Sequence, residues 1–550
     1  MTTVESMLDC LDTVDPDSEL TWTTGNVAEA FPGVFTTLGM SFVFAPMEMA
    51  FRRMFFDLGV YSADELLVPH TVEDCFWSVF DGWGAGNINK FRDIANRMPG
   101  TTASAVEQQL FGFVREGTVD ENTRERYPYI LAKAPRWALR TPTRHDAMFA
   151  ELRRWRLDRL RAVHRYDQYE CRAALADARK RFEDIMSIHM GVAMLSSSLA
   201  EKVADIAKAA GHDGLEAALL SGVGTDENEV AHDLWALAHG MVTLREFTDR
   251  HGYHGPNEGQ ISGVTWREDP SPILARMADY RAIPPDSARA PRVRSAAQAA
   301  RREEALSQLT AGMSTAKRVA VGALVKIATR YLALREQGKA GYLIAFDVAR
   351  ATSRRMGTLL VDRGVIPEPE DVFHLSYRDL MDGISGDKTE LVVARASRYR
   401  VRQSLRLPKS WTGSPEIVSL AGASSTRLRV GEVISGVAAS GGVATGRARI
   451  VSDPDEVELD DGDILVCETT DPAWVPLFMV AGAVVTDHGG LLSHGPIVAR
   501  ELGIPCVCGT ETGSRTIADG QFVKVDGDNG TVEVLEDAPH VALNLNGQQP

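Results

Sequence analysis

Apolar residues between about 45 and 405 recur at every third or fourth position, which is the spacing of one buried helix face. A typical stripe runs through Leu324, Ile327, Ala328, Tyr331 and Leu332. Long stretches with few glycines indicate helices over 146–183, 193–220, 294–337 and 341–363. The pattern therefore predicts one large, mainly helical domain over residues 1–405.

Two glycine-rich segments interrupt this helical pattern. Residues 252–272 contain four Gly and three Pro, and they are expected to form a long ordered loop. Loops of that length inside compact domains are usually functional or disordered. The second segment is Gly82-x-Gly84-x-Gly86. Because no strand pattern precedes it, we expect a helix-breaking turn there rather than a phosphate-binding loop.

The pattern changes near residue 406. Residues 406–429 are rich in Pro, Ser, Gly and Thr and show neither helical spacing nor alternation, so they are expected to be a flexible linker. Beyond them, short alternating or apolar runs predict a small α/β domain over 430–537, followed by a tail at 538–550. Strands are expected at 447–451, 463–466, 483–486, 506–508, 522–525 and 531–534, with helices at 474–480 and 494–502. The predicted fold class is multidomain α+β.

Composition and charge narrow the function classes. A chain of 550 residues is too long for one core, since single cores stop growing near about 250–300 residues. The net charge of −16 opposes a nucleic-acid surface. The longest apolar run, 477–485, is shorter than the roughly 18 residues of a membrane span. Residues 1–20 carry six acidic side chains and neither Lys nor Arg, unlike a secretory signal. We therefore expect a cytoplasmic protein that binds neither nucleic acid nor membrane.

The six cysteines are scattered along the chain and form neither a disulfide framework nor a metal-binding set. The close pair Cys506 and Cys508 lies in an apolar run, so both thiols are expected to lie in the core.

His494 follows a short glycine-rich turn. Residues 483–507 predict a strand, the turn Gly489-Gly490, a helix and a second strand. Ser493 is a good N-cap residue and Pro496 falls in the first turn, so His494 lies at or beside a helix N-terminus. That end of a helix stabilises an anion.

Histidine at such a position can act as a nucleophile near pH 7 and carry a phosphoryl group. Gly489 and Gly490 would let the backbone approach the phosphate without a Cβ in the way. An ordinary turn with a capping histidine is the alternative, and spacing alone leaves the two interpretations about even. A metal site is disfavoured because only His488 accompanies His494.

The same residues resemble the mobile phosphohistidine domain of phosphoenolpyruvate-utilising enzymes over about 430–537. The resemblance is carried by Thr469-Thr470-Asp471-Pro472, by the run Thr-Asp-His-Gly-Gly-Leu-Leu-Ser-His from Thr486 to His494, and by residues 497–505. It implies a swivelling domain in which His494 is phosphorylated. It also implies that the surrounding residues support the phosphohistidine, namely Thr470, Asp471, Thr486, Gly489, Gly490, Ser493 and Arg500.

The upstream region is similar to the substrate domain of rifampicin phosphotransferase and to the histidine-bearing subunit of phenylphosphate synthase. The matching segments are Trp22 to Gly33, Ala95 to Thr101, Gly252 to Glu258, Trp266 to Pro270 and Arg363 to Val372. One departure is Asn257-Glu258-Gly259-Gln260, where the family more often has Gly-Glu-x-Asp. This leaves the role of the loop open.

The resemblance implies an ATP-dependent phosphotransferase with a phosphohistidine intermediate. Too few residues follow His494 for the pyruvate-binding barrel of phosphoenolpyruvate synthase, and no ATP-binding segment is evident upstream. We therefore expect a partner subunit of the ATP-grasp type that binds ATP and Mg²⁺ and releases AMP and phosphate. A phenol or alkylphenol is the first acceptor considered. A natural-product or antibiotic alcohol, and a non-catalytic regulatory homologue, are the alternatives.

An aromatic alcohol needs an apolar pocket with a few polar groups. Residues 31–56 are rich in Met and Phe, and Met40 and Phe44 are candidate pocket residues, with ordinary core packing as the alternative. The loop offers four polar or aromatic candidates, each able to act as a base or to screen phosphate charge: Tyr253, His254, Glu258 and Arg267. A purely structural use of each is about equally open.

Overall fold

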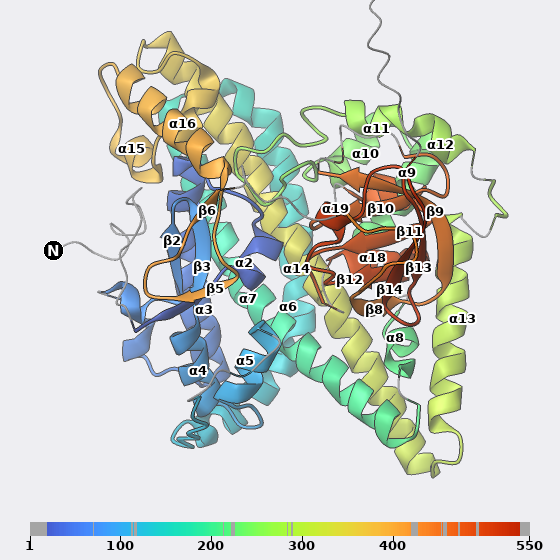
Figure 1. Ribbon diagram of the computed structural model, residues 1–550. Helices are drawn as coiled ribbons and strands as arrows, with labels where there is room; N and C mark the ends of the chain where they lie inside the picture. The colour runs from blue at the N-terminus through green and yellow to red at the C-terminus, as the bar shows by residue number, and fades with distance from the viewer. Residues whose placement is uncertain are drawn as a thin grey trace, which may run out of the picture. The chain divides into compact units, whose positions relative to one another are not determined.

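The computed structural model in Figure 1 describes most of residues 19–538. The residues inside this range that it does not describe are 70, 112–113, 115–117, 213, 222–225, 283, 288–289, 420–426, 453, 455–458, 471–473 and 491–493.

The chain forms two compact units. The first consists of Met1–Leu199, Thr248–Asp269 and Arg330–Ala423, and the second of Ala200–Phe247, Pro270–Thr329 and Ser424–Pro550. The predicted α+β class is confirmed, because a large helical region precedes an α/β region. The predicted boundaries stay predictions, but the compact units group the helical segments differently, since 200–247 and 270–329 pack with the C-terminal part of the chain.

The first unit is built around four long helices, which are α3 (Thr37–Leu58), α6 (Tyr127–Ala162), α7 (Gln168–Ala209) and α14 (Thr315–Asp362). Shorter helices complete it: α2 (Gly25–Ala30), α4 (Ile88–Arg97), α5 (Ala103–Phe111), α15 (Tyr377–Asp382) and α16 (Thr389–Gln403). The core is strongly aromatic, with Phe42, Phe182, Tyr342 and Phe346 among its buried residues.

Three stretches that were predicted to be continuous helices are each broken. The stretch 193–220 is divided between α7 and α8 (Leu215–Leu219), where Gly211 and Gly214 adopt φ values of 80° and 90°. The stretch 146–183 is divided between α6 and α7 because Asp167 and Glu170 form a reciprocal cap: the backbone N–H of each donates to the side chain of the other. The stretch 294–337 is divided between α13 (Pro291–Thr310) and α14, where Gly312 adopts a φ of 75°.

A small antiparallel sheet in the first unit was not predicted. It has the order β2-β3-β1-β5, formed by β2 (Trp77–Phe80), β3 (Trp83–Asn87), β1 (Thr21–Thr23) and β5 (Ser410–Thr412). The expectation that no strand precedes Gly82 is wrong, because Gly82 lies in the hairpin turn between β2 and β3 and has a φ of 81°. The glycine repeat therefore belongs to a packed hairpin. Phe44 lies so close to Gly84 that a Cβ there would meet its ring at 2.5 Å.

Part of the predicted linker is also folded. Ser410–Thr412 pairs with β1, placing Trp411 opposite Trp22, and Phe80 lies within 5.2 Å of each of these rings. Nearby, β4 (Leu405–Arg406) pairs with β6 (Val418–Ser419). Burial of Trp411 explains why this polar segment is ordered.

The second unit contains an eight-stranded sheet with the order β7-β14-β13-β9-β10-β11-β12-β8. Its strands are β7 (Val433–Ser435), β8 (Val437–Ser440), β9 (Val443–Val451), β10 (Ile464–Cys467), β11 (Ala483–Thr486), β12 (Cys506–Cys508), β13 (Phe522–Asp526) and β14 (Thr531–Glu536). The strands β9 to β12 are parallel. Only Gly436 separates the two edge strands β7 and β8, so the sheet curves round upon itself.

Helices flank this sheet. Those within the C-terminal segment are α17 (Val475–Phe478), α18 (His494–Leu502) and α19 (Gly513–Thr516). The others in the second unit are α8 (Leu215–Leu219), α9 (Asp226–Ala238), α11 (Ser271–Ala275), α12 (Met277–Arg281) and α13, while α10 (Leu244–His251) ends just inside the first unit. Cys467, Cys506 and Cys508 are buried free thiols, and burial raises the pKa of Cys506. Within the described ranges, no helix is both long enough and apolar enough to cross a membrane.

Candidate active site

His494 is the first residue of α18, as the sequence predicted. The helix follows β11, and the carboxyl ends of the parallel strands β10, β11 and β12 meet at the same edge of the sheet. Ligands of open parallel sheets bind outside that edge. The backbone N–H groups at the start of α18 carry partial positive charge that would stabilise a phosphoryl group.

Two of the predicted supporting residues border the first turn of this helix. A Cβ placed on Gly495 would lie 2.9 Å from the hydroxyl oxygen of Thr470 and 3.5 Å from Cγ2 of Thr486. Both threonines are buried, and the Thr486 hydroxyl donates to the carbonyl of His488 at 2.9 Å. The structure thus brings Thr470 and Thr486 together at the start of α18. Asp471 and Ser493 lie outside the described residues.

Gly489, Gly490 and Arg500 are three further residues that the sequence predicted to support the site. Gly489 has a φ of 120°, a conformation that favours glycine. Gly490 is exposed, and a Cβ there would meet nothing within 4 Å. Arg500 reaches back one turn, since its Nε donates to the carbonyl of Pro496 at 3.0 Å. Its side chain therefore runs toward the N-terminal end of α18.

Asp487 is a residue of this site that the sequence reasoning missed. Its carboxylate is buried and accepts hydrogen bonds from Thr510 Oγ1 at 2.9 Å, from the backbone N–H of Ser514 at 3.0 Å and from the Ser514 hydroxyl. Its backbone is fixed as well, because its N–H donates to Cys467 and its carbonyl accepts from Glu511. Asp487 thereby holds the start of the glycine turn against the ends of β10 and β12. In the sequence, the only signal for this role of Asp487 was its position directly after a buried strand.

The loop 252–270 contains neither helix nor strand and is ordered, as predicted. His254 Nδ1 lies 2.7 Å from Glu258 Oε2, and both side chains are buried. The amine of Lys339, on α14, lies 3.5 Å from the other carboxylate oxygen of Glu258. The first unit thus contains a buried His–Glu pair beside a lysine.

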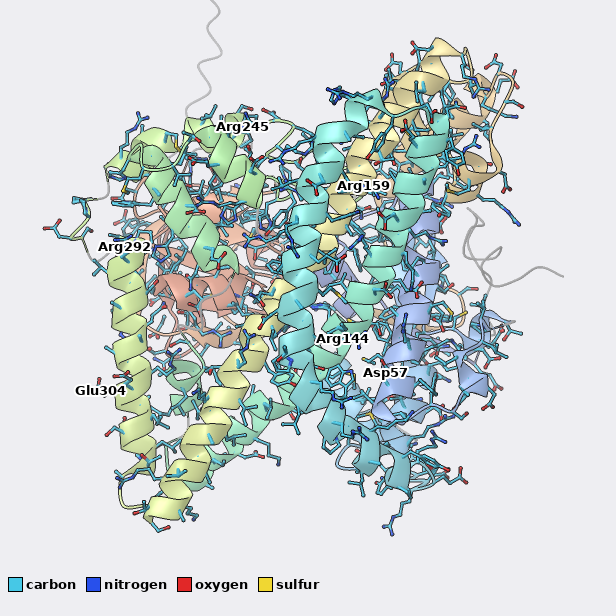
Figure 2. The ribbon with its side chains drawn as sticks, turned by 180° about the vertical axis from the view of Figure 1, so that it is seen from behind. Asp57, Arg144, Arg159, Arg245, Arg292 and Glu304 are labelled. Atoms are coloured by element: carbon cyan, nitrogen blue, oxygen red, sulfur yellow. The ribbon has the colours of Figure 1, made fainter. Side chains whose placement is uncertain are left out.

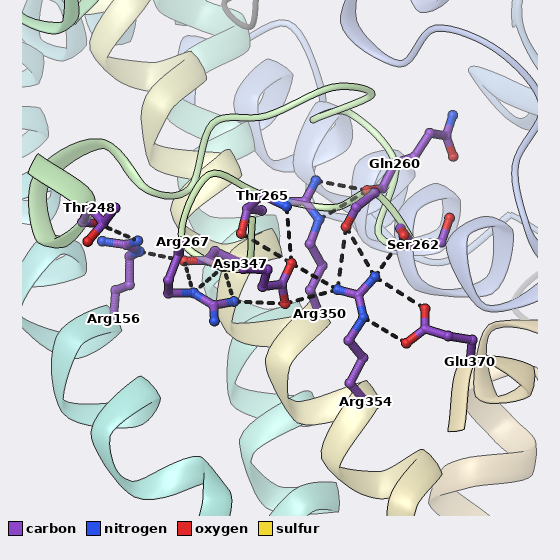
Figure 3. A network of polar contacts seen from close by, with 12 residues as sticks. Arg156, Thr248, Gln260, Ser262, Thr265, Arg267, Asp347, Arg350, Arg354 and Glu370 are labelled. Carbon is purple, nitrogen blue, oxygen red and sulfur yellow. Dashed lines mark hydrogen bonds and ion pairs between the residues drawn. The ribbon is translucent and has the colours of Figure 1, made fainter. Parts of the chain in front are cut away.

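A network of charged residues fixes this loop to α6 and α14 (Figure 3). Asp347 accepts from Arg156 Nε at 2.7 Å and from Arg267 Nη2 at 2.7 Å. Burial raises the pKa of Asp347, but the charges of Arg267 and Arg156 outweigh it and lower that pKa to about 2. The carboxylate therefore stays ionised. Arg267 therefore pairs with Asp347 in the structure. This is the purely structural use that the sequence analysis left open for Arg267.

Two further arginines of α14 extend the network. Arg350 donates to the carbonyls of Glu258 and Gln260, and burial lowers its pKa to about 10. Arg354 pairs with Glu268 at 3.0 Å and with Glu370 at 2.9 Å. These contacts hold the part of the loop that begins at Glu258.

The remaining candidates lie in the interior of the first unit. Tyr253 is fully buried, with the guanidinium of Arg156 over its ring at 5.3 Å. Met40 and Phe44 belong to the aromatic core, and Phe44 packs against Phe35 with ring centroids 5.0 Å apart. The structure therefore places both in core packing, the alternative considered for them.

Other polar groups near Lys339 were also missed. Arg335 Nη1 and His189 Nδ1 are buried and have no hydrogen-bond partner among the described residues. The ring of His189 lies 5.8 Å from that of Tyr342. Burial, with a smaller contribution from Arg335, lowers the pKa of His189 to about 3, so it is neutral. The signal was present in the sequence: charged residues recur at helical spacing along an otherwise apolar helix.

Two family models match parts of the chain. Residues 459–530 match the mobile domain of PEP-utilising enzymes, which includes Thr470, Thr486, His494 and Arg500. Residues 193–336 match the fourth domain of rifampicin phosphotransferase. The chain is therefore similar to PEP-utilising enzymes over residues 459–530 and to rifampicin phosphotransferase over residues 193–336.

Individual proteins are similar to longer stretches of the chain. A rifampicin phosphotransferase of Streptomyces sviceus is 33% identical over 299 residues, which is 53% of this chain and 34% of that protein. A rifampicin phosphotransferase of Bacillus subtilis is 29% identical over 299 residues, which is again 53% of this chain and 34% of that protein. An uncharacterised phosphotransferase of Bacillus subtilis is 36% identical over 200 residues, covering 34% of this chain and 24% of that protein. The chain spans about a third or less of the length of these relatives.

Proposed function

We propose that this chain is the phosphohistidine carrier of an ATP-dependent phosphotransferase whose acceptor is the hydroxyl of a natural-product alcohol such as rifampicin. The observation that carries the proposal is the position of His494 at the start of α18, beside Thr470 and Thr486, inside a match to a PEP-utilising mobile domain.

In the first step the imidazole of His494 attacks a phosphoryl group of the donor. An N–P bond forms, the P–O bond to the leaving group breaks, and the N-terminus of α18 stabilises the bound phosphoryl charge. In the second step the acceptor oxygen attacks phosphorus, an O–P bond forms and the N–P bond breaks. The acceptor proton must pass to a base, because a neutral hydroxyl is a weak nucleophile.

The buried polar group of the first unit supplies candidates for that second step. The His254–Glu258 pair has the composition of an oriented base, since a carboxylate oxygen 2.7 Å from Nδ1 fixes the orientation of the imidazole. Lys339 and Arg335 would provide positive charge for a phosphoryl group. In this proposal His254 and Glu258 remain acceptor-site residues, as the sequence suggested, and Lys339 and Arg335 of α14 are added to them.

The acceptor class follows the relatives' names. The two relatives with a named reaction are rifampicin phosphotransferases, whereas neither is named for a phenol. A natural-product alcohol is therefore preferred here to the phenol or alkylphenol that the sequence favoured. The donor side is proposed to be ATP with Mg²⁺, bound by an ATP-grasp partner. One phosphoryl group passes to His494, water takes the other as phosphate, and AMP is released.

The test is transfer of label from [β-³²P]ATP in the presence of candidate ATP-grasp proteins. Wild type should acquire acid-labile, alkali-stable label, and His494→Ala should not. His488→Ala is the matched control, since it removes a neighbouring imidazole of the same turn and should retain the label. Label that persists in His494→Ala would rule out the mechanism. A chase with rifampicin, and separately with phenol, then shows which acceptor removes the label.

A further inference from the structure

The N-terminal half of α6 exposes a row of apolar side chains. Leu131, Pro135 and Leu139 follow one another at intervals of four residues, which places them on one face of the helix. Leu131 is 66% exposed and Leu139 is 82% exposed, and Pro135 is exposed as well. Single apolar residues on a surface are ordinary, whereas a contiguous row of them is a feature of binding surfaces.

Three exposed arginines lie beside this row on the same helix. They are Arg136, Arg140 and Arg144, the last of which is labelled on α6 in Figure 2. Their side chains make no hydrogen bond or ion pair with any other residue that the structure describes. In contrast, Arg159 in the second half of the helix pairs with Asp177 at 2.9 Å. The first half of α6 thus presents cations that the first unit does not neutralise.

The charge of this part of α6 is opposite to that of the whole chain. Residues 127–144 contain four basic residues and no acidic one, whereas the chain carries a net charge of −16. One of the four, Lys133, is used within the unit, because its amine donates to the carbonyl of Phe56 at 3.1 Å. The other three are the arginines described above. A guanidinium group matches a carboxylate through two parallel hydrogen bonds. The surface therefore fits a partner that presents carboxylates beside apolar side chains.

The same charges disfavour two other occupants. A second copy of the chain, docked by the same face about a twofold axis, would bring Arg136, Arg140 and Arg144 near the same three residues of the other copy. Like charges placed together in this way cost several kcal/mol. An anionic membrane would attract the arginines but repel the rest of a chain whose net charge is −16. An acidic surface on another protein meets neither objection.

We propose that the face of α6 formed by Leu131, Pro135, Leu139 and the three arginines binds an acidic, partly apolar helix of a partner protein, and that this partner is the ATP-binding protein. The identity of the partner rests on the proposed function, whereas the chemistry that it must present rests on α6 alone. With a rise of about 1.5 Å per residue, the arginines are spaced roughly 6 Å apart along the helix axis. Carboxylates at every fourth position of a partner helix would meet all three.

The experiment titrates the full chain with each candidate ATP-grasp protein by isothermal titration calorimetry, without nucleotide. Wild type should bind one of them, and the dissociation constant should rise as salt is added. The variant Arg136→Ala/Arg140→Ala/Arg144→Ala should raise the dissociation constant at least about tenfold at low salt and much less at high salt. Leu139→Ser should raise it about tenfold at either salt concentration, because the lost contact is apolar.

Arg154→Ala/Arg161→Ala/Arg165→Ala is the matched control. It removes the same charge from exposed positions at the other end of α6 and just beyond it, and it should leave the dissociation constant within about twofold of wild type. Equal affinity of wild type and the first arginine variant would overturn the proposal, as would failure of every candidate to bind wild type.

Two further measurements on the chain alone test the other occupants. Binding to phosphatidylglycerol vesicles, or dimerisation, that Leu139→Ser abolishes would overturn the proposal, because the face would then belong to a membrane or to a second copy. The calorimetry requires no ATP. Binding of a candidate that transfers no label to His494 would therefore support the docking surface and contradict the proposed function.

Discussion

The turn before α18 and the loop at 252–269 are both rich in glycine, but different interactions hold them. In the turn, Asp487 accepts from Thr510 and Ser514, which lie 23 and 27 residues along the chain and are uncharged. In the loop, Arg267 and the carbonyl of Gln260 bind Asp347 and Arg350, which lie 80 and 90 residues away and are charged.

The two regions belong to the two steps of the proposed chemistry, which are phosphorylation of His494 and transfer to the acceptor. The geometry around His494 depends on one compact α/β domain and on hydroxyl and amide groups that water can replace. The geometry around His254 and Glu258 depends on buried ions, which are costly once one partner is removed. Substitutions in the loop at 252–269 should therefore change mainly the stability of the protein, and substitutions in the turn before α18 mainly the rate of the proposed phosphoryl transfer to His494.

The largest effect is expected for Asp347→Ala. It leaves the charges of Arg156 and Arg267 buried together, and breaking such a group typically costs about 3–5 kcal/mol. Because the pKa of Asp347 is lowered to about 2, its contribution is present above about pH 4 and is lost as the pH falls toward 2. Urea unfolding at pH 7, with hydrogen exchange of the Trp266 and Arg267 amides, measures the loss.

Asp347→Asn is the control for size, because it keeps an acceptor in the same place and removes only the charge. If Asp347→Ala lowered the free energy of unfolding by less than about 1 kcal/mol, the loop would not depend on the ion pairs of Asp347.

His145→Phe tests a buried polar group in the same unit that lacks an ionic partner. Both ring nitrogens are buried and have no hydrogen-bond partner among the described residues. Burial lowers the pKa of His145 from 6.5 to about 4, so the unfolded chain binds a proton first as the pH falls below 6.5. Wild type should lose about 2 kcal/mol of unfolding free energy between pH 7 and pH 5 through this group.

The phenylalanine variant should lose correspondingly less over that interval. His164→Phe, at an exposed position, should leave the pH dependence as in wild type. Identical pH dependence in His145→Phe and wild type would contradict the prediction.

Asp487→Ala tests the histidine turn. The turn loses three side-chain hydrogen bonds to Thr510 and Ser514, and the rate at which His494 accepts label should fall about 10- to 100-fold, as expected for about 1.4–2.7 kcal/mol of lost positioning. In Asp487→Asn this rate should fall less, because the amide oxygen replaces one of the two carboxylate oxygens as an acceptor. Unchanged near-ultraviolet circular dichroism would show that the domain remains folded, and a rate within twofold of wild type would exclude the positioning role.

The smallest effect is expected for Gly495→Ala. Its Cβ would lie 2.9 Å from the Thr470 hydroxyl, so the neighbour must shift by a few tenths of an ångström, at a cost of about 1 kcal/mol. Thermal unfolding measures the cost. The double variant Gly495→Ala/Thr470→Ala should recover the stability, and the absence of recovery would place the strain elsewhere.

Much of the C-terminal domain could be predicted from the sequence. The predicted ranges 483–486, 506–508 and 494–502 agree with β11, β12 and α18. The two strands are short apolar runs next to Gly or Pro, and the helix has Pro496 in its first turn and Gly503 after its last residue. The sheet of the first unit could not be predicted, since it combines Thr21–Thr23 with Ser410–Thr412. The division between α6 and α7 had a local signal, the Asp167-x-x-Glu170 cap, that helical periodicity concealed.

The sequence by itself determined the local structure around His494: a strand, two glycines and a helix beginning at His494 are set by neighbours along the chain, since turn and cap energies are local. Tertiary structure decided what Arg267, Tyr253 and Phe44 do. The partners of Arg267 and Tyr253 lie on α14 and α6, which meet the loop only when the chain has folded. Phe44 is buried against Phe35 and the hairpin at Gly84. Burial by residues far along the chain is poorly predicted from local sequence patterns, and the role of a buried charged residue can be assigned only when its partner is known.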